Sequence, residues 1–122
     1  MDKQIKNIWV KALRSGEFKQ GRGHLEKDGC YCALGVLSVL ALLEGICTYE
    51  EVRGVGTFDK REFKLSYNVM KWADIAQDNE RYLIPAEHGV IVKIKGEETS
   101  IMELNDKGLS FKKLASIIER HL

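Results

Sequence analysis

The chain has 122 residues, of which 44% are hydrophobic and 30% charged, and this size and composition predict a single compact domain over residues 1–122. Nineteen basic and eighteen acidic residues leave a net charge of +1, which argues against a nucleic-acid-binding protein, because such proteins carry an excess of Lys and Arg. Residues 1–6 lack the apolar stretch of a secretory signal, so we expect a cytoplasmic protein.

The first predicted element is an amphipathic helix over residues 4–14. Apolar side chains recur there at helical intervals, with basic side chains on the other face. The side chains that this spacing places on the inner face are Ile5, Ile8, Trp9 and Leu13. Ser15-Gly16 then ends the helix. Residues 17–30 contain three glycines among polar residues, which predicts a loop or a short hairpin.

The most apolar segment, residues 31–44, predicts a buried central helix. Almost every side chain from Tyr31 to Leu43 is apolar, and a helix without a polar face is enclosed by the rest of the protein. The run is shorter than the roughly 20 residues that a bilayer span requires. We therefore expect a core helix and no membrane association.

The middle of the chain predicts little regular structure. Thr48 and Glu51 have the spacing of a capping box, which favours one or two helical turns. Residues 54–61 combine glycines with charges, and this composition predicts an exposed loop. Ser66 is placed to cap a short helix. The apolar residues of that helix are Val69, Met70, Trp72 and Ala73.

The last third of the chain predicts one strand and one helix. β-branched residues over 89–96, with a glycine at each end, favour a strand. Residues 99–104 fit either its hairpin partner or a helical turn. Ser110 is placed to cap a final helix with Phe111, Leu114, Ile117 and Ile118 on its inner face. The elements together predict an α+β fold: three or four helices around the buried central helix, with a small antiparallel sheet.

Cysteine chemistry offers the sharpest catalytic hypothesis. Cys30, Cys32 and Cys47 are an odd set without a zinc-ligand pattern, so we expect free thiols and neither a metal nor a cofactor. Cys32 opens the central helix, where the helix dipole lowers a thiol pKa.

A partner for this thiol is His88, which opens a later strand, and this order is similar to that of papain-like hydrolases. Glu103 or Asn105 would orient the imidazole. The favoured interpretation of Cys32 is nevertheless structural, because cysteine is often buried as a small apolar residue.

Binding surfaces are the other hypothesis. Tyr49 and Phe58 flank the glycine-rich loop and are candidates for a contact surface. Three arginines, Arg14, Arg22 and Arg61, are candidates for holding a small ligand, such as a signalling nucleotide, within a homo-oligomer.

Three motifs together resemble a family of small tailed-phage and prophage proteins. They are Trp-x-x-Ala-Leu-Arg-Ser-Gly at residues 9–16, Cys-x-Leu-Gly-Val-Leu at residues 32–37 and Leu-Asn-Asp-x-Gly-x-Ser-Phe at residues 104–111. The resemblance implies a phage origin, and thus the host cytoplasm, but no reaction or catalytic set. We therefore expect a non-enzymatic accessory protein that binds a host protein, such as a defence or regulatory component. The Cys32/His88 thiol hydrolase and the oligomeric small-ligand binder remain as alternatives.

Overall fold

The computed structural model describes residues 1–75 and 90–122. Over these residues the chain forms five helices and two small sheets, which confirms the α+β class. The helices are α1 (Lys3–Arg14), α2 (Ala33–Leu43), α3 (Tyr67–Ala73), α5 (Ile101–Asp106) and α6 (Phe111–His121). The strands are β1 (Lys19–Gln20), β2 (Glu26–Lys27), β3 (Cys30–Tyr31), β4 (Tyr49–Val52), β5 (Val55–Phe58), β6 (Ile91–Ile94) and β7 (Glu97–Ser100).

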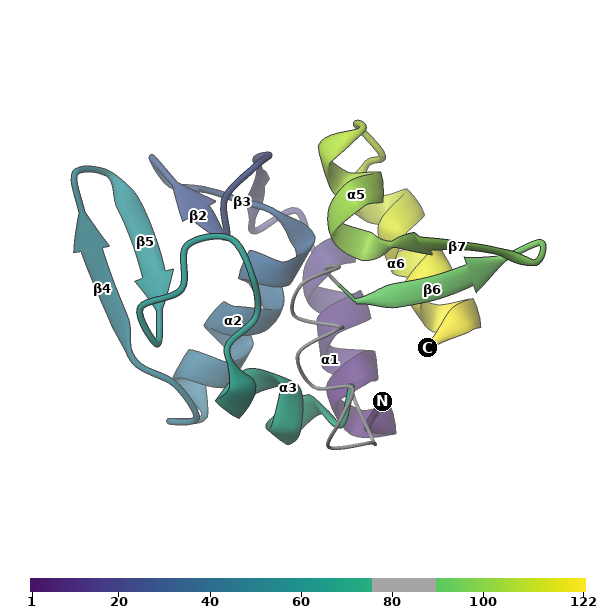
Figure 1. The fold of residues 1–122 in the computed structure, drawn as a ribbon, viewed down its shortest axis with the longest axis horizontal. Coiled ribbons are helices and arrows are strands. Elements are labelled where there is room, and N and C mark those ends of the chain that lie inside the picture. The colour runs from purple at the N-terminus through teal and green to yellow at the C-terminus, as the bar shows by residue number, and fades with distance from the viewer. Residues whose placement is uncertain (76–89) are drawn as a thin grey trace.

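Helix α2 is the predicted central helix. It packs against α1, α3 and α5, and every side chain from Ala33 to Ser38 is buried (Figure 1). The Trp9 indole of α1 donates a hydrogen bond to the Ala33 carbonyl at 2.9 Å. Gly35 lies directly against the backbone of Leu25, where a Cβ atom would stand 1.8 Å from the carbonyl oxygen. The helix is thus fixed on one side by an indole and on the other by a backbone contact that requires glycine.

The larger sheet lies at one end of the molecule, with β4 as its outermost strand (Figure 1). Its strand order is β1-β3-β2-β5-β4, and all pairs are antiparallel except β1–β3. The predicted loop or hairpin at residues 17–30 contains β1, β2 and the first residue of β3, and each of these strands is two residues long. Helix α2 packs against β3, and its Gly35 lies against Leu25, the residue before β2.

Two predictions in the middle of the chain are wrong. Residues 49–52 form strand β4 rather than helical turns, and residues 55–58 form strand β5 rather than an exposed loop. Thr48 does not cap a helix: its backbone N–H and its hydroxyl donate to the Asp59 carboxylate at 2.9 and 3.2 Å. A contact eleven residues away in the chain therefore overrides the local capping pattern.

The short helix predicted after Ser66 is confirmed as α3, where the Ser66 hydroxyl accepts from the Val69 N–H. In the C-terminal part both alternatives for residues 99–104 occur in succession. Residues up to Ser100 pair with β6 as β7, and the Ser100 hydroxyl then accepts from the Glu103 N–H at 3.0 Å to begin α5. The final helix α6 begins at its predicted cap, Ser110, and packs along α1.

The inner face of α1 differs by one residue from the prediction. Val10 is buried, whereas Ile8 is 40% exposed, because the packing of α6 turns the Val10 side of the helix inward. Within the described residues no helix combines the length and the apolar character that crossing a bilayer demands.

Candidate functional site

The thiol of Cys32 is enclosed and lacks activation. It lies at the N-cap of α2 and is 2% exposed. Burial raises the pKa of this thiol from 9.0 to about 11, although the backbone N–H groups of Gly35 and Leu34 oppose the shift. This direction is opposite to the one that a nucleophilic thiol requires. All three cysteines are free thiols, as predicted.

Of the predicted partners of Cys32, the structure describes Glu103 and Asn105. His88 lies outside the described residues. Glu103 is exposed on α5, and its carboxylate pairs with Lys107 at 3.0 Å. Asn105 does lie near the start of α2, but its polar atoms are bound to other groups.

Asn105 is the centre of a buried hydrogen-bond network. Its Oδ1 accepts from the Ala33 N–H at 3.1 Å and from the Gln20 side chain at 3.0 Å. Its Nδ2 donates to the Gly21 carbonyl at 2.9 Å. The Gln20 amide continues the network, accepting from the Phe111 N–H at 3.1 Å and donating to the Leu109 carbonyl at 2.8 Å. We call this set, Gln20, Gly21, Ala33, Asn105, Leu109 and Phe111, the Asn105 network.

The Asn105 network joins the loop after α1, the start of α2 and the turn between α5 and α6. The motifs Cys-x-Leu-Gly-Val-Leu and Leu-Asn-Asp-x-Gly-x-Ser-Phe meet in it directly. Their polar residues thus hold three chain segments together. The sequence gives no local signal for this, because the bonded groups are 72 to 91 residues apart.

Of the two aromatic residues predicted to form a contact surface, the structure exposes one. Phe58 is fully buried, because strand β5 turns it toward the core, so its prediction as a contact residue is wrong. Tyr49 is 42% exposed and packs edge-on against Phe58, with 5.2 Å between ring centroids. Tyr49 therefore lies at the surface, and its ring is held in place by the buried ring of Phe58.

A buried carboxylate that sequence reasoning missed lies beneath Tyr49. Glu26 of β2 accepts hydrogen bonds from the Tyr49 hydroxyl and from the Gly29 N–H. Burial, followed by the hydrogen bond to Glu26, raises the pKa of Tyr49. Gly56 makes room for the pair, since a Cβ atom there would stand 2.1 Å from Glu26 Oε1.

The backbone of β4 faces outward at two residues. The Asp59 N–H donates to the Thr48 carbonyl, and the register pairs Tyr49 with Phe58. Antiparallel ladders alternate between hydrogen-bonded and non-hydrogen-bonded pairs, so the N–H and C=O groups of Tyr49 and Glu51 point away from β5. All four residues of β4 are exposed, and Val52 is 54% exposed. We call Tyr49–Val52, with these outward groups, the β4 edge.

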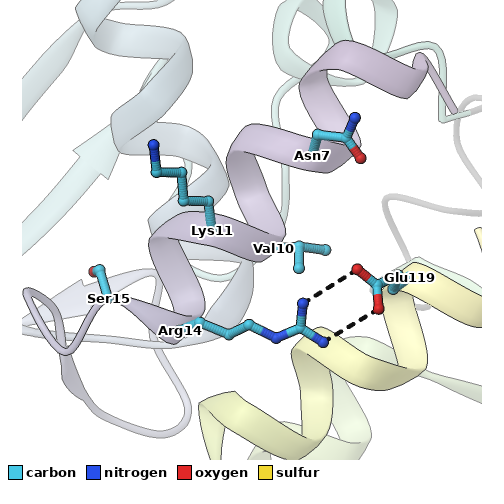
Figure 2. Close-up of a pocket in the computed structure, with 6 residues that line it drawn as sticks. All are labelled: Asn7, Val10, Lys11, Arg14, Ser15 and Glu119. Atoms are coloured by element: carbon cyan, nitrogen blue, oxygen red, sulfur yellow. Dashed lines mark hydrogen bonds and ion pairs between the residues drawn. The ribbon is translucent and has the colours of Figure 1, made fainter.

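The three candidate arginines lie in different places. Arg14 lines a groove of about 440 Å³ between α1 and α6, and its guanidinium pairs with Glu119 at 3.1 Å (Figure 2). Arg22 lies beside Gly108, and Arg61 lines a groove with residues 60–64. The described part of the chain also contains no cluster of three or more His, Cys, Asp or Glu side chains that could hold a metal ion.

Comparison with known proteins identifies a family but no activity. No curated protein matches the chain significantly. No solved structure matches it significantly either. The family described as a domain of unknown function, DUF8296, matches residues 1–122. The chain therefore belongs to the DUF8296 family.

Proposed function

We propose that this protein is a phage-type accessory protein that binds a host protein without catalysing a reaction, and that the β4 edge is its contact surface. The observation that carries the proposal is the outward direction of the Tyr49 and Glu51 backbone groups. An exposed edge strand is a template on which an extended segment of another chain can pair.

The side chains of the β4 edge add affinity to this backbone pairing. Tyr49 and Val52 expose apolar surface, and Tyr49 is anchored through Glu26 and Phe58, so little side-chain entropy is lost on binding. An anchored, partly exposed tyrosine is the kind of residue that dominates binding energies.

The charges of the edge favour a different chain over a second copy. Antiparallel pairing of two β4 strands about their centre would bring the Glu50–Glu51 carboxylates of one copy against those of the other. A partner strand with Lys or Arg opposite these glutamates is favoured instead. The phage origin and the host target rest on the motif resemblance and belong to the same proposal.

The test is capture of host proteins by the tagged chain, compared between two substitutions at one position. Glu51→Pro removes the outward N–H without breaking the ladder to β5, whereas Glu51→Ala removes the side chain and keeps the N–H. We expect a stoichiometric host protein with the native chain and with Glu51→Ala, and its loss with Glu51→Pro.

Thermal unfolding of both variants supplies the control, because Glu51→Pro must remain folded for its loss of binding to count. A host protein captured equally by a folded Glu51→Pro would show that another surface binds it. If the native chain captured no host protein, the binding-module proposal itself would be rejected.

A further inference from the structure

The two packed helices α1 and α6 concentrate positive charge that the whole-chain total conceals. They carry seven basic side chains and one acidic one, a net charge of +6 in a chain whose total is +1. The rest of the chain is therefore acidic. The seven basic side chains, which we call the basic face, are Lys3, Lys6, Lys11, Arg14, Lys112, Lys113 and Arg120.

Helical spacing places three of these charges, Lys3, Arg14 and Lys112, along the boundary between the two helices. Lys3, Asn7, Val10 and Arg14 recur every three or four residues on the side of α1 that meets α6. On α6 the matching row is Lys112, Ser116 and Glu119, of which the last two bind Arg14.

Within these two helices one carboxylate, that of Glu119, lies among the seven cations, and it pairs with one of them. Glu119 pairs with Arg14, and the charges of Lys6 and Arg120 also act on it, so that together they lower its pKa. Lys11 points away from Glu119 in the close-up of the groove (Figure 2). Among the described residues, the paired helices α1 and α6 therefore carry an excess of positive charge.

We propose that the basic face binds the phosphodiester backbone of a nucleic acid. Asn7 lines the groove between the helices and is exposed, and its side-chain amide is a donor of the kind that contacts phosphate oxygens. Protein-binding surfaces instead centre on apolar and aromatic residues, and the aromatic residue of α1, Trp9, is buried in the core. Neither helix exposes a Phe, Tyr or Trp side chain, and this favours phosphates over an acidic protein.

The length of the basic face sets how many phosphates it can contact, and so how strongly the binding affinity should depend on salt. Lys3 and Arg14 are eleven residues apart, which spans about 16 Å along the helix. One DNA strand presents about four or five phosphates over that length. Four contacts predict a slope of about −3.6 for log K against log[salt], or a loss of affinity of roughly 100-fold between 50 and 200 mM salt.

The test measures binding of the full chain to labelled duplex DNA, single-stranded DNA and duplex RNA by fluorescence anisotropy across that salt range. The patch variant is Lys3→Gln/Lys11→Gln/Lys112→Gln. The matched control is Lys27→Gln/Lys71→Gln/Lys93→Gln, which removes the same charge from exposed lysines outside the basic face.

At about 100 mM salt we expect at least tenfold weaker binding by the patch variant, together with a shallower salt slope, and less than a twofold change in the control. Binding to any of the three probes with this pattern supports the proposal and identifies the nucleic acid. The proposal is overturned if no probe binds at 50 mM salt, if both triple variants lose affinity equally, or if polyglutamate binds as tightly as the nucleic acids. None of these outcomes involves the β4 edge, so the two proposals fail separately.

Discussion

The Asn105 network and the β4 edge both consist largely of backbone N–H and C=O groups, yet they use them in opposite ways. In the network a buried side chain satisfies groups from three distant segments. At the edge, Tyr49 and Glu51 direct the same groups toward solvent. The comparison indicates that the motif residues of the network hold distant segments of the fold together, while the proposed contact surface lies in a strand outside the motifs. Substitutions in the two regions should therefore separate stability from binding.

The largest effect is expected where α2 meets the backbone of Leu25. Gly35→Ala would place a Cβ atom 1.8 Å from the Leu25 carbonyl oxygen, which neither backbone can avoid without moving. We expect a loss of about 3–5 kcal/mol in the free energy of unfolding, measured by urea denaturation. Gly16→Ala is the control, because Gly16 has φ +78° but no atom within 4 Å of the added carbon. Its loss should be only about 1 kcal/mol.

Removing the central amide of the network should have the next largest effect. Asn105→Ala leaves the Ala33 N–H, the Gly21 carbonyl and part of the Gln20 amide without partners in a buried site. We expect a loss of about 2–4 kcal/mol in the same denaturation experiment. The control is Asn68→Ala, which removes one exposed bond to Asp59 and should cost less than about 1 kcal/mol. Equal losses in the two variants would contradict the central role of Asn105.

Alkaline pH should destabilise the same region through Cys32. The pKa of its thiol is 9.0 when unfolded and about 11 when folded, so between these values the unfolded state binds fewer protons. Stability is therefore intact below pH 9 and falls as the pH rises toward 11, by up to about 2–3 kcal/mol. Denaturation of the native chain and of Cys32→Ala from pH 8 to 11 measures the difference. Parallel pH profiles would show that the thiol does not titrate differently in the folded state.

A smaller effect is expected beneath the β4 edge. Tyr49→Phe removes the hydroxyl that donates to the buried Glu26 carboxylate, which should cost about 1–2 kcal/mol. In a Glu26→Gln background the same substitution should cost less, because the charged acceptor is absent. A double-mutant cycle measures this coupling. A coupling energy of zero would mean that Tyr49 is held by its packing on Phe58 alone.

The smallest effect is expected at the edge itself. Val52→Thr changes a side chain that is 54% exposed, and we expect a change within about 0.5 kcal/mol. Val92→Thr in β6 introduces the same hydroxyl at a buried position and should cost about 1–3 kcal/mol. A large loss for Val52→Thr would show that β4 is part of the packed core and not a free edge.

Elements with a strong local pattern could be predicted from the sequence. The central helix is confirmed because a continuous apolar run leaves no polar face, and α3 and α6 are confirmed because Ser66 and Ser110 signal their starts. The β4–β5 hairpin was mispredicted because Thr48 and Glu51 match a helix cap locally, whereas Thr48 binds Asp59 across the hairpin. The prediction for Phe58 was wrong for the same reason. Alternate side chains of β5 are buried, and this assigns Phe58 to the core only if residues 55–58 are known to form a strand.

The sequence by itself determined the α+β class, the buried helix and the free cysteines, because these follow from composition and periodicity within short windows. Tertiary structure alone decided the role of Asn105, the burial of Glu26, the outward groups of β4 and the union of two basic helices into one face. The role of Asn105, the burial of Glu26 and the packing of α1 on α6 depend on contacts between segments far apart in the chain, and the outward groups of β4 depend on its register with β5. No local pattern encodes such contacts, since hydrogen bonds and charges act over distances in space and not along the sequence.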